Sequence, residues 1–403
     1  MTRTSIRLAL SAAFMLGVAT SAYAADDKPK PPKLTPGVQK VLAEVQAANT
    51  KKDYPAALAA IAKAQQVDGR TNADNLMIDR FAMIVHVGMN DFASAAVDAE
   101  AAADILISDP SASNEPGAVL KPALQLALNA KTYDKAAKYA KAFLATDPPA
   151  ADKGMIAQAL YLGGDYDSAG AIAMQNLVAA KTANIKPARN DLSILMSVQV
   201  KKKDEVGAEA SLEALVMYYG DPSDWGQMLS VSMGAKGLTD LDYIYLGRLM
   251  PVTNATVTAQ DGQLVGSTAN KSALYGDAEA FQKIGGPAPD SRAAADKKSM
   301  PEQIKLGAKQ GGEYNVKLAE ALYGYGQYEA AITAAQTAKQ KGGVKDPIEA
   351  DMVIGQSQAA LGQYAAAVAT FAGITAPNPA RARVVRLWGY YAKSKIANAA
   401  PAK

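Results

Sequence analysis

The 403-residue chain contains no cysteine and a single histidine, and aromatic residues make up only 6% of it. The absence of cysteine excludes a disulfide framework and a lipid-modified N-terminal cysteine. The single histidine, His86, excludes every catalytic or metal site that needs two, and we interpret it as a packed or half-exposed residue. Charged residues amount to 20% against 49% hydrophobic residues, a balance that argues against disorder over most of the length.

Residues 1–24 have the pattern of a cleavable secretory signal peptide. Arg3 and Arg7 provide the positive start, residues 8–18 the apolar stretch, and Ala22-Tyr23-Ala24 the cleavage site. No later apolar run approaches the ~20 residues that cross a bilayer, so we expect no stable membrane insertion after cleavage. An uncleaved membrane anchor is the alternative. A secreted chain of this size without disulfides fits the periplasm of a Gram-negative bacterium.

The mature chain is close to neutral. Removing Arg3 and Arg7 takes the 42 basic residues to 40, against 39 acidic residues, which leaves a net charge of +1. This balance provides no electrostatic case for binding nucleic acid. Residues 25–37, rich in proline and lysine, are expected to form an extended leader.

One helix-turn-helix pattern organises the rest of the chain, and its clearest copy lies between residues 354 and 379. Its landmarks are, in order, Ile354-Gly355, Gly362-Gln363, Tyr364, Ala367, Phe371 and Pro379. Glycine at 355 lets a second helix approach closely, and Gly362 breaks the first helix because glycine tolerates turn conformations. Tyr364 opens the second helix, where Ala367 has room for little beyond a methyl group.

An aromatic residue followed three positions later by alanine recurs at Tyr54, Phe92, Tyr133, Tyr166, Tyr275 and Tyr328. A further copy at Lys203-Asp204-Glu205 keeps Ala208 but lacks the aromatic residue. The pattern resembles the tetratricopeptide repeat (TPR). We therefore predict an all-α, TPR-like α-solenoid of stacked antiparallel helix pairs with a C-terminal capping helix. An ordinary alanine-rich helical bundle is the alternative.

The predicted organisation has five parts after the leader. They are an N-terminal TPR-like array (38–220), degenerate helical repeats (221–284), a linker (285–300), a C-terminal TPR pair (301–379) and a capping helix (380–396). Gly285-Gly286-Pro287 marks the linker as the strongest break in the chain. The last helix is amphipathic, so we interpret it as the cap that a repeat array needs. A basic docking helix is the alternative.

Two short motifs resemble catalytic signatures, and we reject both. Residues 355–359 approximate the nucleophile elbow G-x-S-x-G, but they lie inside a predicted helix rather than at a strand-to-helix turn. Residues 266–272 approximate a phosphate-binding loop, but Asn270 stands where its second glycine is required. The carboxylates show no metal-binding spacing. We therefore predict no catalytic residue, no cofactor and no metal site.

The resemblance to TPR proteins implies a concave groove, lined by the first helix of each repeat, that binds peptides or protein segments. Carried over position by position, the groove candidates are Arg80, Lys121, Gln125, Tyr161, Glu320, Tyr323 and Gln356. The family's Lys/Asn/Arg clamp for a terminal carboxylate is not reproduced, because Met155 stands where asparagine is expected.

The leading hypothesis is a non-catalytic periplasmic scaffold that binds another protein or a peptide, of unknown identity, through this groove. The alternative is a cell-envelope factor that binds or processes peptidoglycan through the irregular region 221–284, which contains Trp225.

Overall fold

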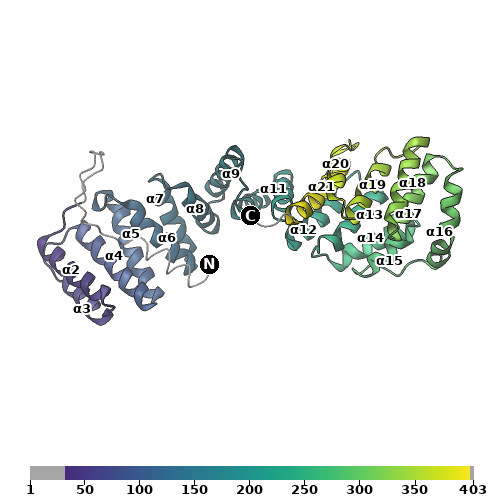
Figure 1. Cartoon of the computed structure of the whole chain (residues 1–403). Coiled ribbons are helices and arrows are strands. Elements are labelled where there is room, and N and C mark those ends of the chain that lie inside the picture. Colours follow the sequence, from purple (N-terminus) through teal and green to yellow (C-terminus); the bar gives the residue numbers. More distant parts are fainter. Residues whose placement is uncertain (1–31, 400–403) are drawn as a thin grey trace. The chain divides into compact units, whose positions relative to one another are not determined.

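The structure, a computed structural model, describes residues 32–399. Within this range the chain is all-α, with twenty α-helices, one short 3-10 helix and no β-strand (Figure 1). The predicted signal peptide and most of the leader lie outside the described residues.

The chain divides between Lys202 and Lys203 into two compact units. Unit 1 contains α2 (Pro36–Thr50), α3 (Tyr54–Ala64), α4 (Asn72–Met89), α5 (Phe92–Ser108), η1 (Pro110–Ala112), α6 (Pro116–Asn129), α7 (Tyr133–Leu144), α8 (Ala150–Leu162), α9 (Tyr166–Thr182) and α10 (Arg189–Lys201). Unit 2 contains α11 (Glu205–Tyr218), α12 (Pro222–Met233), α13 (Asp240–Val252), α14 (Ala259–Lys271), α15 (Tyr275–Gln282), α16 (Ala293–Gly307), α17 (Gly312–Gly324), α18 (Tyr328–Lys341), α19 (Glu349–Ala360), α20 (Tyr364–Ala372) and α21 (Pro379–Ala399).

One turn recurs between helices in both units. Two residues before a new helix, the backbone adopts the left-handed conformation with positive φ, at Lys52, Asn90, Lys131, Gly164, Lys203, Ala273, Gly326 and Gly362. The helices that follow begin at Tyr54, Phe92, Tyr133, Tyr166, Glu205, Tyr275, Tyr328 and Tyr364. Every anchor residue of the sequence pattern therefore starts a helix, including the copy without an aromatic residue.

The residue between the left-handed position and the anchor is the N-cap residue of the new helix. In four turns it is an aspartate whose carboxylate accepts the backbone N–H three residues later: Asp53, Asp91, Asp165 and Asp204. Such a cap satisfies one of the free N–H groups at the helix start. In these four turns the sequence therefore encodes the helix start locally.

The alanine three residues after each anchor lies where helices approach most closely. Seven of these alanines have no exposed surface: Ala57, Ala95, Ala136, Ala169, Ala278, Ala331 and Ala367. Gly355 shows the same restriction, because a Cβ atom there would lie 2.6 Å from a ring atom of Phe371. Small residues at these positions allow the helix pairs to stack.

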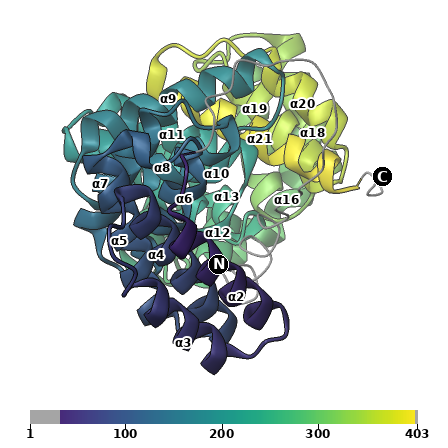
Figure 2. The ribbon, with the colours of Figure 1, turned by 90° about the vertical axis from the view of Figure 1, so that its left-hand side faces the viewer.

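Within unit 1, consecutive helices pack against one another in chain order, and Figure 2 shows the pairs α2–α3 and α4–α5 side by side. One apolar core joins α2 to α4, and a second runs from α4 to α10. The described part of the chain is therefore a stack of antiparallel helix pairs, which confirms the predicted fold class.

The division into units differs from the predicted organisation. The boundary falls inside the turn of the expected fifth pair, so α10 and α11 belong to different units. The segment 221–284, expected to be degenerate, forms α12 to α15 within unit 2, and α16 begins inside the expected linker 285–300.

Unit 2 has two helices that are buried on nearly all sides. In α13 every residue from Ile244 to Met250 is buried, and α19 is almost as enclosed. The last helix, α21, packs against α20 and also against α11, α12 and α13. The end of unit 2 therefore returns to its beginning and covers the last repeat.

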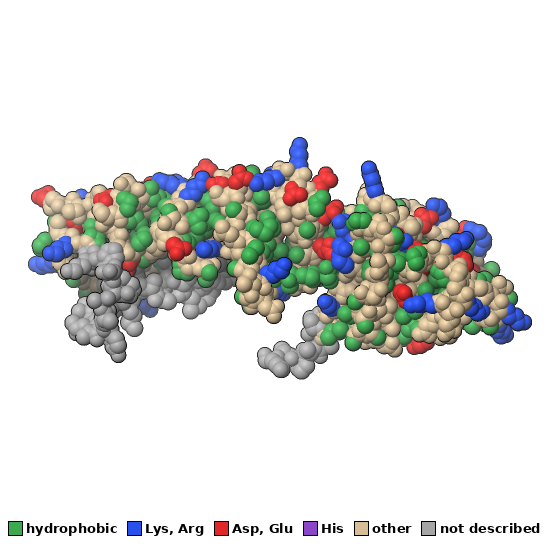
Figure 3. Space-filling view, turned by 90° about the horizontal axis from the view of Figure 1, so that it is seen from above, with side chains coloured by type: hydrophobic (Ala, Val, Ile, Leu, Met, Phe, Trp, Pro, Cys, Tyr) green, Lys and Arg blue, Asp and Glu red, His purple; other side chains and the backbone are tan. Residues whose placement is uncertain are grey.

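No helix among residues 32–399 combines the length and the apolar character needed to span a bilayer. In the space-filling view, acidic and basic side chains are interspersed over the visible face (Figure 3).

Candidate functional site

The groove candidates fall into two groups with different environments. Glu320, Tyr323 and Gln356 lie on α17 and α19 of unit 2, and their exposed fractions are 0%, 9% and 0%. The candidates of unit 1 lie on α4, α6 and α8: Arg80, Lys121, Gln125 and Tyr161. We use "inner face" for the surface that these first helices of the repeats present in each unit.

In unit 2 the three candidates converge on one side chain that the sequence did not single out. Arg248, on α13, donates to Gln356 Oε1 at 2.7 Å and stacks 4.0 Å from the centre of the Tyr323 ring. Its Nη2 also lies 2.8 Å from Glu320 Oε2, close enough for an ion pair although the contact lacks the alignment of a hydrogen bond.

Two more residues complete this Arg248 cluster. Asp277, on α15, accepts two hydrogen bonds from Arg248, each at 2.8 Å, in a bidentate arrangement. Tyr245, one turn before Arg248, donates its hydroxyl to Glu320 Oε1 at 2.5 Å. The cluster therefore joins α13, α15, α17 and α19 by polar contacts in the interior of unit 2.

This arrangement corrects the expectation that Glu320, Tyr323 and Gln356 line an open groove. Their positions do face inward as the repeat register predicts, but α13 occupies the space in front of them. The physical reason is the apolar surface that α13 buries around Ile244, Leu246 and Leu249. The carboxylates of the facing helices compensate the cost of burying the Arg248 guanidinium.

Burial and neighbouring charges together shift the pKa values of Arg248, Glu320 and the nearby Glu349. Burial alone lowers the pKa of Arg248, but Asp277 and Glu320 outweigh it and hold this pKa well above its ordinary value. Burial raises the pKa of Glu320 despite the nearby guanidinium. Burial, with the added repulsion of Glu320, also raises the pKa of Glu349 to about 7. Arg248 is thus charged at neutral pH, whereas Glu349 is partly protonated.

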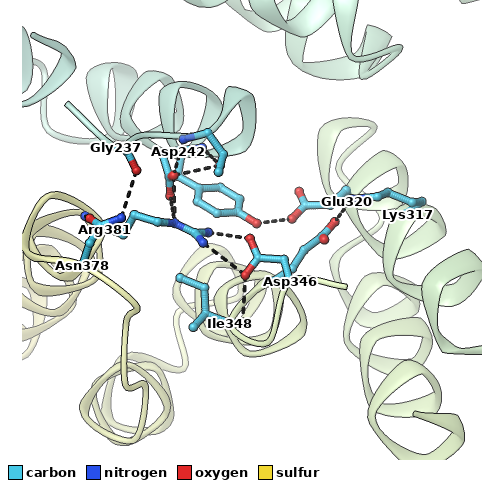
Figure 4. A network of polar contacts seen from close by, with 11 residues as sticks. Gly237, Asp242, Lys317, Glu320, Asp346, Ile348, Asn378 and Arg381 are labelled. Carbon is cyan, nitrogen blue, oxygen red and sulfur yellow. Dashed lines mark hydrogen bonds and ion pairs between the residues drawn. The ribbon is translucent and has the colours of Figure 1, made fainter. Parts of the chain in front are cut away.

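A second arginine ties α21 into unit 2. Arg381 donates through Nε to Asp242 on α13 at 3.0 Å and through Nη2 to Asp346, in the α18–α19 loop, at 2.6 Å (Figure 4). Beside it, Lys317 lies 2.6 Å from Glu349 Oε1, while Glu349 Oε2 is buried without a hydrogen-bond partner. Three carboxylates of this region, on Asp242, Asp346 and Glu349, therefore face two cations, Arg381 and Lys317.

Two further arginines of α21 also pair with acidic residues of unit 2. Arg383 bonds to Glu209, and Arg386 bonds to Glu213 through both Nε and Nη2, at 2.6 and 2.9 Å. Trp388 is buried and donates its indole N–H to Tyr245 O at 3.1 Å. Within unit 2, α21 therefore caps the array while its arginines pair with acidic residues of the same unit.

The inner face of unit 1 is more accessible. Lys121, on α6, is 41% exposed and forms an ion pair of 2.7 Å with Asp152 on α8. Gln125 and Tyr161 are half-buried, and the Tyr161 ring packs 5.4 Å from that of Tyr166. Arg80 is 9% exposed, so only part of its side chain reaches the surface. The face is polar, with its lysine neutralised by a neighbouring helix.

His86 takes part in a polar cluster between α4 and α5. Its Nδ1 lies 2.6 Å from Asp98 Oδ2, and both side chains are 19% exposed. Burial, together with the charge of Asp98, raises the pKa of the nearby Asp79 to about 6. His86 is therefore the packed, half-exposed histidine that the sequence predicts.

A pocket of about 510 Å³ opens beside the Arg248 cluster, between the start of α13, the α14–α15 turn, α16 and α17. Its acidic side chains already have partners: Asp296 accepts the Tyr325 hydroxyl at 2.8 Å, and Asp240 pairs with Lys271 at 2.9 Å. The volume suits a small molecule.

The two rejected motifs lie in helices. Ser357, the serine of the elbow-like motif, is fully buried in α19, and residues 266–271 lie in α14. Among the described residues no three of His, Cys, Asp and Glu are grouped so that they could hold a metal ion.

Comparison with known proteins does not identify a family. No family model matches the chain, and no curated protein matches it. Among solved structures, the chain is similar to one from the complex of Naa15 and Naa10 bound to HypK-THB, with 13% sequence identity. That alignment covers 87% of this chain and 70% of the other, with a TM-score of 0.23. The architecture described above rests on the helices and turns of this chain alone.

Proposed function

We propose that this chain is an exported TPR-type scaffold that binds another protein, or a peptide segment, on the inner face of unit 1. One observation supports this choice of surface. The corresponding positions of unit 2 are filled by Arg248 and its partners, whereas Lys121, Gln125 and Tyr161 of unit 1 keep part of their surface exposed.

We further propose that the scaffold is not catalytic and works in the periplasm. The absence of cysteine and the single histidine of the sequence support the first part. The pattern of residues 1–24 supports the second. The protein should be found in the periplasmic fraction of its host, and N-terminal sequencing of that protein should give Ala25 as the first residue. A chain that retains Met1 would contradict export with cleavage.

Site-specific photocrosslinking in cells tests the binding surface. A photoreactive residue placed at Gln125 or Tyr161 should capture the same one or two envelope proteins, and Lys121→Ala should reduce their yield. Val97, which is 65% exposed on the second helix of its pair, is the matched control position. Equal capture from Val97, or none from the two inner positions, would rule out this face.

The peptidoglycan alternative has less support. Trp225, the tryptophan of the region that this alternative invokes, is 3% exposed and offers no face on which a sugar ring can stack. Deleting residues 225–286 is not a clean test, because this segment supplies Arg248 and Asp277 to the core of unit 2. The pocket of about 510 Å³ is the feature there that suits a small molecule.

A further inference from the structure

Glu349, the first residue of α19, is buried with only one of its two carboxylate oxygens in a hydrogen bond. Its side chain is 1% exposed, and Oε1 accepts from the ammonium group of Lys317 at 2.6 Å, whereas Oε2 has no hydrogen-bond partner. A buried carboxylate is costly to keep ionised when its charge is incompletely compensated, and a bound proton removes that charge. The geometry of Glu349 therefore favours its protonated form.

The charges around Glu349 act in the same direction. Glu320 of α17 and Asp346 of the α18–α19 loop repel its ionised form, whereas Lys317 attracts it (Figure 4). The Lys317 side chain is 53% exposed, so water weakens this attraction. The other charged and titratable groups around α19 are engaged elsewhere: Arg248 by Asp277 and Glu320, Tyr245 by Glu320, Lys339 by Asp351, Lys341 by carbonyl groups at the end of α16, and Arg381 by Asp242 and Asp346. Helix α20 contains no charged residue.

The segment that precedes Glu349 is built to move relative to α18. The α18–α19 loop, residues 342–348, begins with Gly342 and Gly343, whose φ values are 68° and 74°. Glycine adopts such conformations at little cost, and no atom lies within 4 Å of where a Cβ would stand at either position. An ion pair between Asp346 and Arg381 ties the loop to α21. The two glycines therefore provide a hinge, and the ion pair is the contact that an opening of this hinge breaks.

We propose that protonation of Glu349 holds the α18–α19 loop and the first turn of α19 closed against α17, and that ionisation opens them. In the open form the Glu349 carboxylate is hydrated and distant from Glu320, and its proton has passed to the solvent. Asp346 moves with the loop, so opening also removes one of the two carboxylates that hold Arg381 at the start of α21. This switch acts within unit 2 and does not depend on the binding surface proposed for unit 1.

The pKa of Glu349 sets the pH range of the opening. Burial, with the added repulsion of Glu320, raises this pKa to about 7 in the closed form, whereas the ordinary value of 4.5 applies once the group is hydrated. Closure is therefore most favourable below pH 4.5, becomes weaker as the pH rises through 7, and changes little at higher pH. Opening between these two limits releases one proton.

Hydrogen–deuterium exchange of the mature full-length chain, measured by mass spectrometry at pH 5 and pH 8, tests this proposal. Each observed rate is compared with the intrinsic rate at the same pH, so that the ratio reports structural protection alone. The protection of residues 342–352 should fall by about ten-fold or more from pH 5 to pH 8. At pH 8 it should also be lower than the protection of α14, because the loop opens without the rest of unit 2.

Three variants separate Glu349 from other causes. Glu349→Gln has no charge to lose, so the protection of residues 342–352 should be nearly the same at pH 8 as at pH 5. Lys317→Gln removes the compensating cation and should lower the protection at pH 8 by about three-fold or more, with a smaller effect at pH 5. Glu302→Gln changes a carboxylate that is 77% exposed and should behave like the parent chain.

Three results would overturn the proposal. The first is equal protection of residues 342–352 at the two pH values, or protection equal to that of α14 at both. The second is a variant Glu349→Gln that keeps the pH dependence of the parent chain. The third is a variant Lys317→Gln that is better protected than the parent chain at pH 8.

Discussion

Replacing Arg248 by methionine should destabilise unit 2 strongly while leaving unit 1 intact. Methionine keeps much of the aliphatic stem but removes the charge, so Asp277 and Glu320 lose their common partner inside the protein. Both carboxylates are almost completely buried, with side-chain exposures of 3% and 0%. Removing one member of such a buried ion-pair network costs about 3–5 kcal/mol.

This cost should be visible as a lower melting temperature. For a unit of about 200 residues, each kcal/mol shifts the melting temperature by about 2–4 °C, so we expect a decrease of roughly 6–20 °C. The two tryptophans of the chain, Trp225 and Trp388, are both buried in unit 2. Tryptophan fluorescence therefore follows unit 2 alone, whereas far-UV circular dichroism follows the helices of both units.

The matched control is Arg292→Met, which changes an arginine whose side chain is 70% exposed and pairs with the nearby Asp290. It should leave the tryptophan-detected transition unchanged. Adding Asp277→Asn and Glu320→Gln to Arg248→Met should recover part of the loss, because the isolated charges are then absent. If Arg248→Met lowers the transition no more than Arg292→Met does, the cluster does not hold unit 2 together.

Three further predictions concern pH, packing and turn geometry. The folded pKa of Glu349, about 7, exceeds its ordinary value of 4.5, so its stabilising contribution is complete below pH 4.5 and is lost as the pH rises through 7. The unfolding free energy of unit 2, followed by tryptophan fluorescence, should therefore fall between pH 5 and pH 8, and Glu349→Gln should flatten this dependence. Overpacking should lower the unfolding free energy by about 1–3 kcal/mol in each of the variants Ala136→Leu and Ala367→Leu. Circular dichroism should detect both changes, whereas tryptophan fluorescence should detect only that of Ala367→Leu, which lies in unit 2. Ala273→Gly should raise the denaturation midpoint by relieving about 1 kcal/mol of left-handed strain, and Gly362→Ala should lower it by a similar amount; equal effects of the two would contradict the turn assignment.

The helix pairs could be predicted from the sequence because their determinants are local. Each turn has a residue with positive φ and a small residue in the next helix, and four of the eight turns add an aspartate cap, all within six positions. These requirements produce a recognisable sequence pattern even where the aromatic anchor is missing. Glu205, for example, still begins a helix after Lys203, whose backbone is left-handed.

The closure of unit 2 could not be predicted in the same way because its determinants are far apart in the chain. Arg248 meets Gln356 across 108 positions, and Arg381 meets Asp242 across 139. A repeat register assigns each inner position to a face, but it does not say which helix will occupy the space in front of it. One signal was present: α13 is apolar on most sides yet carries a single arginine. A buried helix of this kind requires carboxylates from its neighbours.

The two inner faces consequently differ in what they can bind. A peptide that entered the inner face of unit 2 would have to displace α13 and separate Arg248 from its carboxylates. Breaking this ion-pair network costs about 3–5 kcal/mol, so the affinity of the peptide would fall by roughly two to four orders of magnitude. A peptide on the inner face of unit 1 has only the Lys121–Asp152 pair to compete with, and partly exposed pairs of this kind contribute about 0–1 kcal/mol. The same repeat register thus leads to a filled interior in one unit and an accessible surface in the other, and the difference originates in what stands opposite the first helices rather than in those helices themselves.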